Sequence, residues 1–243
     1  MLKKLRRHPA NLHLNLMLAL TFSTGVADAV GYLGLEKVFT GNMTGNVVIL
    51  FMALAGAPGL PVIGPLVALF AFMLGAAIAG RVLRPIKLGW TWHTTILLSV
   101  VGMTMTGVAI ALFVMGGAPR QPWEYLITGL LAMAMGMQAA TARHIAVKDV
   151  TTVVVTSTIT SIAADSWFGG GRGQLWYRRG GAILLIGAGA LVGALLLRLE
   201  IGYGVALSAG ITMLVALLGH LAGRVHHAPQ HAAQAAEKAP LSA

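Results

Sequence analysis

The stretch of this chain that decides its fold is VFTGNMTGN, residues 38–46, which opens a run of 43 residues without a charged side chain. The run is too long for one membrane crossing, because roughly 20 apolar residues span a bilayer core about 30 Å thick. The helix-breaking cluster GAPGLP at residues 56–61 divides it. We therefore expect a short, polar-rich helix at about residues 42–56 and a full membrane helix at about residues 61–83.

The composition of the whole chain is that of an integral membrane protein. Of its 243 residues, 57% are hydrophobic and 10% are charged, whereas about 25% are charged in a typical soluble domain. The formal net charge of +10 comes from basic residues that cluster between long uncharged stretches. Such clusters indicate membrane topology rather than nucleic-acid binding. Cysteine is absent from the sequence, so disulfides and thiolate metal sites are excluded.

Further apolar runs predict the remaining helices of an all-α, polytopic membrane protein. They cover residues 12–35, 91–115, 123–142, 151–164, 181–197 and 203–221. The run at 151–164 is short and rich in Val and Thr, as a strand would be. An isolated strand would leave its backbone unpaired in lipid, so we expect a second short helix there.

The basic clusters decide whether the two short segments cross the membrane. They lie at residues 3–7, 81–87, 143–148, 172–179 and 224. If both short segments enter and leave on the same side, every cluster falls on one side, as the positive-inside rule requires. We therefore expect six full transmembrane helices plus two short re-entrant or broken segments, with both termini cytoplasmic. The alternative is seven or eight full spans.

Two halves of the chain, about residues 12–116 and 121–223, show a weak internal similarity. Because each half then holds three full crossings, an odd number, the two repeats would be inverted. The alignment matches Thr40 with Thr152, Thr44 with Thr156, Gly25 with Gly136 and Gly75 with Gly193.

The ends of the chain are expected to lie outside this single transmembrane domain of residues 12–223. Residues 1–11 form a basic, cytoplasmic N-terminus. Residues 224–243 are rich in Ala and His, and we expect a disordered cytoplasmic tail there.

Polar residues at the start of each short segment predict a binding site. In the first segment, Asn42 and Asn46 share one helical face with Thr44 between them; in the second, Thr152 and Thr156 hold the matching places. Two helix N-termini meeting at mid-membrane would present unpaired N–H groups and positive dipole ends to an anion or polar solute. Alternatively, these side chains only cap backbone groups and hold helices together.

Asp28 is an acidic residue within the first predicted span, and Thr24 lies one helical turn before it. A carboxylate in hydrocarbon costs ~2.5–3.5 kcal/mol on insertion scales, so we expect Asp28 to face the bundle interior. It is a candidate proton carrier or substrate ligand, or else it bonds only to nearby backbone or an Asn. Gln138 occupies a related stripe of the helix at residues 123–142. The predicted substrate-binding residues are therefore Asp28, Thr24, Asn42, Thr44, Asn46, Gln138, Thr152 and Thr156.

Motifs of enzymes and cofactor sites are missing from the sequence. It has neither HExxH nor GxSxG, and its predicted spans contain no paired carboxylates. The His residues match no metal-site spacing. We therefore expect no enzyme activity, no catalytic residues, no metal and no cofactor.

Two signature stretches resemble the YoaK family of bacterial membrane proteins, a family of unknown function. The first is FSTGVADAVGYLGL at residues 22–35 with VFTGNMTGNVV at 38–48, and the second is GMQAA at 136–140 with TTVVVTSTIT at 151–160. The resemblance covers about residues 14–221 and implies a multi-pass inner-membrane protein with no assigned substrate. Family members usually carry Asn where this chain has Ala139, and commonly Gly where it has Ser157.

Two functions from different classes fit these patterns. The first is a transporter or channel for a small polar or anionic solute, because inverted halves with interrupted helices suit a site near the midplane. The alternative is a non-transporting membrane factor, such as a lipid-binding, assembly or sensory partner. The expected surroundings are the lipid bilayer, and no nucleic acid.

Overall fold

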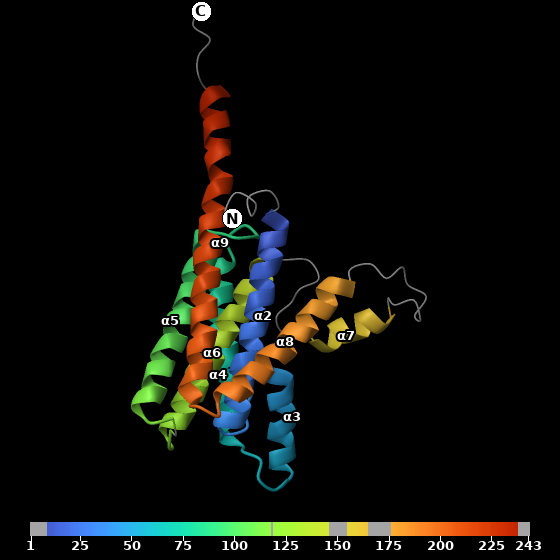
Figure 1. The fold of residues 1–243 in the computed structure, drawn as a ribbon, viewed down its shortest axis with the longest axis vertical. Coiled ribbons are helices and arrows are strands. Elements are labelled where there is room, and N and C mark those ends of the chain that lie inside the picture. Colours follow the sequence, from blue (N-terminus) through green and yellow to red (C-terminus); the bar gives the residue numbers. More distant parts are fainter. Residues whose placement is uncertain (1–8, 118, 146–154, 165–175, 238–243) are drawn as a thin grey trace, which may run out of the picture.

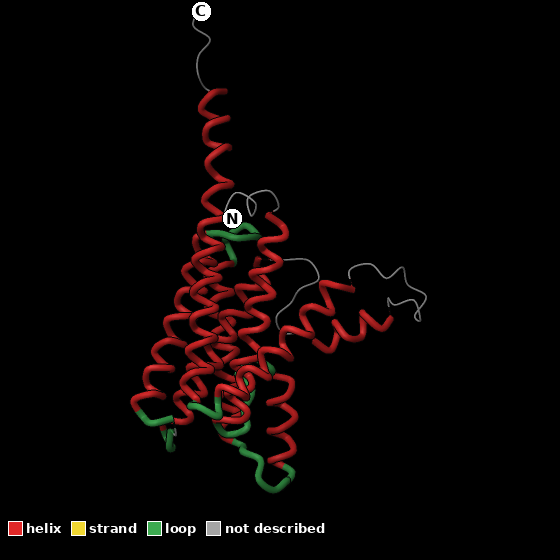
Figure 2. The backbone as a smooth tube through the Cα atoms, in the orientation of Figure 1, coloured by secondary structure: helices red, strands yellow, loops and turns green. Residues whose placement is uncertain are grey.

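The structure is a computed structural model that describes residues 9–117, 119–145, 155–164 and 176–237. For some residues near the ends of these ranges it describes the backbone but not the side chain. Within the described ranges the secondary structure is helical and contains no strand, which confirms the all-α prediction. Figure 2 shows the helices joined by short turns at both ends of the bundle. The helices are α2 (Pro9–Gly34), α3 (Met43–Leu54), α4 (Ile63–Leu83), α5 (Trp92–Val114), α6 (Trp123–Ile145), α7 (Val155–Ala164), α8 (Trp176–Leu196) and α9 (Ile201–Glu237).

Five of these helices contain a stretch long and apolar enough to cross a membrane. The stretches are Leu12–Gly34, Ile63–Leu83, Trp92–Val114, Trp123–Ile145 and Ile201–Ala222. The crossing predicted at residues 181–197 corresponds to the apolar part of α8, Gly180–Leu196, which is shorter than these five. Helix α3 is also short and apolar.

Local sequence explains where α3 and α5 begin and end. Asn42 caps α3 by accepting a hydrogen bond from the Gly45 N–H at 3.3 Å. The turn that follows α3 contains Gly56 at φ +87°, a conformation that glycine adopts without strain. Helix α5 begins with a capping box, in which the side chains of Thr91 and Thr94 bond each other's backbone N–H groups.

The helices pack in a bundle from which α7 and part of α8 lean away (Figure 1). Helix α2 packs against α8 and α9, while α6 packs against α4 and α5. Helix α5 also packs against α9. The two short helices lie on the outside, α3 against α4 and α7 against α8.

Glycines bring the most closely packed helix pairs together. A Cβ atom at Gly75 of α4 would collide with the carbonyl oxygen of Met133 in α6, and one at Gly136 would collide with that of Phe72. Gly25 of α2 stands against the Ile186 carbonyl of α8 in the same way. Close backbone approach through small residues is the usual basis of helix association in membranes.

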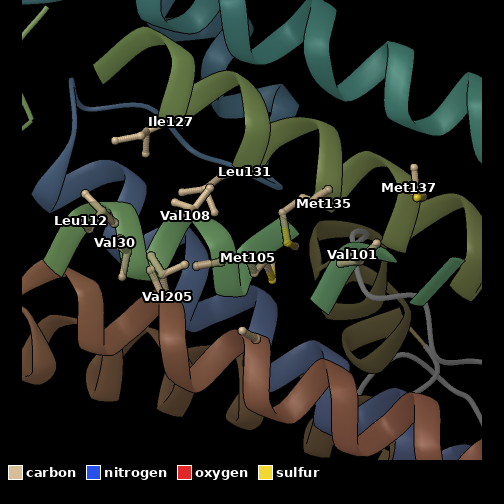
Figure 3. Close-up of a cluster of buried hydrophobic side chains, with 14 of the residues drawn as sticks. Val30, Val101, Met105, Val108, Leu112, Ile127, Leu131, Met135, Met137 and Val205 are labelled. Atoms are coloured by element: carbon tan, nitrogen blue, oxygen red, sulfur yellow. The ribbon is translucent and has the colours of Figure 1, made fainter. Parts of the chain in front are cut away.

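The main apolar core lies between α2, α5, α6 and α9 (Figure 3). Val30, Met105, Leu131 and Val205 are among its buried side chains. A second buried cluster, which includes Met17, fills the bundle nearer the N-terminal end of α2. The N-terminal half of α2 and its last two turns therefore contact different apolar clusters.

The turn between α3 and α4 lies beside the C-terminal end of α2. Lys37, just beyond α2, donates a hydrogen bond from Nζ to the carbonyl oxygen of Gly59 in that turn, at 2.9 Å. Val38 packs against the start of α4 at Gly64 and Ala68. The chain therefore returns, after α3, to the end of the bundle where α2 finished.

The last described helix extends beyond the predicted transmembrane domain. Helix α9 continues past residue 224 to Glu237. The segment from 228 to 237 is rich in Ala, which has the highest helix propensity, and this explains how the helix extends beyond the apolar region.

Candidate functional site

Asp28 of α2 meets the chain where α3 is about to begin. Its Oδ1 accepts hydrogen bonds from the Gly41 N–H at 2.6 Å and from the Thr40 hydroxyl at 3.2 Å. The backbone N–H groups of Thr40 and Asn42 also lie near enough to this carboxyl group to interact with it electrostatically. Successive N–H groups that point at one oxygen-bearing group form an anion-binding nest. In this chain the nest is filled by the protein's own carboxyl group.

Gly41 fits into a tight space, where an added side chain would force its neighbours to shift by a few tenths of an ångström. A Cβ atom there would lie 3.2 Å from Thr24 Cγ2, 3.3 Å from Met135 Cε and 3.4 Å from Asp28 Oδ1. Three groups from α2 and α6 thus surround the backbone at the start of α3. The absence of a side chain at residue 41 allows the N–H groups to reach Asp28.

Asn46 closes the loop that carries Gly41. Its Oδ1 accepts from the Phe39 N–H at 2.8 Å, and its Nδ2 donates to the Phe39 carbonyl oxygen at 2.6 Å. Asn46 is 1% exposed, and the Phe39 ring stacks on Tyr32 of α2 with centroids 4.8 Å apart. The prediction placed Asn42 and Asn46 on one face toward a solute, but the Asn46 amide binds the protein's own backbone.

A row of buried polar side chains continues from this point across α2, α6 and α9. Gln138 Nε2 donates to the Thr24 hydroxyl at 3.3 Å, and Gln138 Oε1 accepts from the Thr212 hydroxyl at 3.3 Å. Ser23 and Ser208 each donate a hydroxyl to the other's carbonyl oxygen at 3.2 Å. All five side chains are 2% exposed or less. We call these five residues the polar row.

The polar row and the nest adjoin each other at Thr24. Thr24 lies four residues before Asp28, about 6 Å along α2, and its methyl group contacts Gly41. The hydroxyls of Thr24 and Thr212 also lie 2.9 Å and 2.8 Å from carbonyl oxygens one turn earlier in their own helices. The row is therefore extensively hydrogen-bonded within the protein.

Two of the five residues of the polar row were predicted from the sequence. It named Thr24 and Gln138, which the structure brings together, but it missed Ser23, Ser208 and Thr212. Ser208 and Thr212 stand one turn apart in the otherwise apolar stretch 203–221, and that spacing is a signal for a buried polar face. Asn42 and Thr44 are exposed beside the cap of α3.

Comparison with known proteins identifies the family. The profile of a family described as "Protein of unknown function (DUF1275)" matches residues 16–218. The chain belongs to this family. The UPF0700 transmembrane protein YoaK of Bacillus subtilis (strain 168) is 28% identical over 151 residues, which are 62% of this chain. These residues span 65% of the length of that relative. No solved structure matches the chain.

The family match confirms the resemblance to YoaK proteins and, with the apolar helices, establishes a multi-pass membrane protein. Thr152, which belongs to the second signature stretch, lies outside the residues that the structure describes. Thr156 is in α7, and only its backbone is described. Among the residues that the structure describes, no group of three His, Cys, Asp or Glu side chains is placed to hold a metal ion.

Proposed function

We propose that this protein is a transporter or channel for a small polar or anionic solute, and that the solute binds where α3 begins. The observation that carries the proposal is the carboxyl group of Asp28 in the nest at residues 40–42, next to the buried polar row. Asp28 is partly buried, and ionisable groups within membrane helices are costly and typically mark substrate or ion pathways. The start of a broken or short helix is where transporters commonly bind solutes.

We further infer a topology of six crossings, with α3 and α7 as re-entrant segments and both termini in the cytoplasm of a bacterial cell. Helix α3 has 12 residues, about 18 Å at 1.5 Å per residue, which is well short of the ~30 Å core. The contact between Lys37 and Gly59 supports a return of the chain to the side where α2 ends. The basic clusters then all lie on the inner side of the membrane.

An inverted pair of halves is supported by the way the helices pack. If α2, α3, α4 and α5 correspond to α6, α7, α8 and α9, each packed pair has a counterpart. The α2–α8 contact corresponds to α6–α4, the α2–α9 contact to α6–α5, and the α3–α4 contact to α7–α8. The α5–α9 contact corresponds to itself.

The glycine contacts change which residue of α8 corresponds to Gly75 of α4. Gly75 meets the Met133 carbonyl, and Gly189 meets the Phe22 carbonyl in the same manner. Gly75 therefore corresponds to Gly189 rather than to Gly193, which the sequence alignment matched. Gly25 and Gly136 remain equivalent, and the residue equivalent to Asp28 is Ala139. The second half thus has no carboxyl group at the position of Asp28.

The nest defines how a solute would bind. An anionic group that enters the nest competes with the Asp28 carboxylate for the same N–H groups, because both need the positive end of α3. A neutral polar solute instead has to break hydrogen bonds of the polar row. The charge on Asp28 therefore controls which solutes enter.

The test is solute flux in proteoliposomes that contain the whole chain, measured for a panel of small anions and neutral polar solutes. Asp28→Asn keeps a hydrogen-bond acceptor but removes the charge, and Asn46→Ala frees the loop. Because Asp28→Asn removes a charge beside the proposed site, we expect it to alter the flux of a transported anion about tenfold, which corresponds to about 1.4 kcal/mol. Thr106→Ala, on the exposed side of α5, is the control and should leave flux unchanged. If neither Asp28→Asn nor Asn46→Ala alters any flux that the wild type supports, the site is wrong.

One observation favours the alternative of a non-transporting membrane factor. Gln138, Ser23 and Ser208 all bond to groups within the chain, as they would in a row that only holds helices together. A lipid-binding, assembly or sensory partner needs no solute path. Co-purification of one defined partner with a protein that supports no flux would favour this alternative.

A further inference from the structure

A groove opens between α5 and α6 on the outer side of the bundle. It has a volume of about 270 Å³. One wall is the face of α5 from Thr104 to Met115, and the other is the face of α6 from Trp123 to Leu130. Buried Val108 forms part of the floor, while Met115 and Trp123 at the rim are exposed.

The groove exists because α5 carries a glycine at its centre. A Cβ atom at Gly107 would meet no heavy atom within 4 Å, so this residue leaves space rather than filling a contact. Gly107 therefore differs from Gly75 and Gly136, which stand against the backbone of a neighbouring helix. Ala111, one turn further along α5, is the next small residue in the same wall.

The groove has the depth of one leaflet. Thr104 and Met115 are 11 residues apart, about 16 Å along the helix, and half of a bilayer core is about 15 Å. Met115 caps α5 and Trp123 begins α6, so this end lies at the membrane surface, where Trp is favoured. The other end reaches the middle of α5.

A cationic residue lies in the turn at the surface end. Arg120 is exposed, and its carbonyl oxygen accepts the Trp123 N–H at 2.9 Å, so it directly adjoins the rim. Guanidinium groups bind phosphate oxygens well. The groove therefore combines an apolar floor with a positive charge at the depth of lipid headgroups.

We propose that this groove binds one acyl chain of a phospholipid, with Arg120 at the phosphate of the same lipid. The occupant is one extended chain, because the apolar groove is about as long as one leaflet is deep. A volume of about 270 Å³ lies near the lower limit of small-ligand pockets, at ~300 Å³. The lipid site is independent of the nest at Asp28.

The experiment uses the whole protein in phosphatidylcholine vesicles doped with phosphatidylglycerol that carries a photoactivatable diazirine on its acyl chain. Crosslinked peptides are mapped by mass spectrometry. Gly107→Leu fills the groove, and Ala77→Leu, on the exposed side of α4, is the matched control. We expect Gly107→Leu to lower crosslinking at α5 and α6 about threefold, while crosslinking to α4 stays constant. Ala77→Leu should leave the groove signal unchanged.

The headgroup is tested with Arg120→Gln. Crosslinking by the phosphatidylglycerol probe should fall, whereas crosslinking by a diazirine diacylglycerol without a phosphate should not.

Equal crosslinking in wild type and Gly107→Leu would overturn the groove site, as would an equal loss in Ala77→Leu. A change of oligomeric state in Gly107→Leu without loss of crosslinking would instead assign the groove to a second copy of the chain. If Gly107→Leu is not monodisperse, Ala111→Leu replaces it.

Discussion

At Asp28 and Asn46, two polar side chains bind the backbone of the same loop, which leads into α3. Asp28 accepts from the Gly41 N–H, and Asn46 exchanges two hydrogen bonds with Phe39. A polar group that enters an apolar region is costly unless it is hydrogen-bonded. Both side chains therefore stabilise a loop whose backbone groups would otherwise be exposed to lipid.

Asn46 and Asn42, one turn apart, should differ strongly when each is replaced by Ala. Asn46→Ala removes the partners of the partly buried backbone groups of Phe39, at up to about 1–3 kcal/mol for each. Asn42→Ala removes an exposed helix cap, worth about 1 kcal/mol. Thermal unfolding of the purified variants in one detergent should show the larger loss for Asn46→Ala. Equal losses would mean that the Asn46 amide does not hold the loop.

At this scale the sequence predicts which residues are buried and polar better than it predicts their partners. The isolated carboxyl of Asp28 and the stripe with Thr24 and Gln138 can be recognised because charge and amide groups are rare in apolar spans. The partner of Asn46 depends on a loop geometry that no spacing rule encodes. The matching N-terminus in the second half stays a prediction, because Thr152 lies outside the described residues.

At Gly75 and Gly136, helices α4 and α6 pack without room for even one added methyl group. Gly75 and Gly136 stand opposite backbone carbonyls of the facing helix, and Gly25 and Gly189 do the same between α2 and α8. The glycine-mediated pairs therefore join the two halves of the chain. A helix in lipid gains little from apolar burial alone, so this close approach supplies much of the attraction.

Gly136→Ala and Gly210→Ala should change stability in opposite directions. A Cβ atom at residue 136 collides with the Phe72 carbonyl, and overpacking of this kind costs about 1–3 kcal/mol. A Cβ atom at residue 210 of α9 meets no heavy atom within 4 Å. Replacing Gly by Ala there should raise the free energy of unfolding by up to ~1 kcal/mol, through helix propensity. Thermal unfolding checks both, and a neutral Gly136→Ala would contradict the close packing.

The existence and bounds of the helices could be predicted closely from sequence, because long apolar runs and breakers such as GAPGLP are local signals. The prediction of 61–83, for example, corresponds to α4 at Ile63–Leu83. Which helices pack together could not be predicted, since membrane helices are apolar on most faces. The proposed equivalence of Gly75 with Gly189 could not be predicted from sequence for the same reason, because many residues in α8 are small and apolar.

On the scale of the whole molecule, the packing of the helices has an approximate twofold character, but the two halves are not chemically equal. One half has Asp28 and a loop bound to it, whereas Ala139 stands at the equivalent place of the other. A site between the halves is therefore expected to be controlled from the side of α3. The central claim is that α3 enters the membrane from one face and returns to it.

Single-cysteine labelling tests this claim most directly, since the chain has no native cysteine. Pro58, in the turn after α3, and Leu88, after α4, are both exposed. With a membrane-impermeant maleimide, we predict that Pro58→Cys reacts in intact cells and that Leu88→Cys reacts only after lysis. Labelling of Leu88→Cys from outside, with Pro58→Cys protected, would mean that α3 crosses the bilayer completely and would contradict the account.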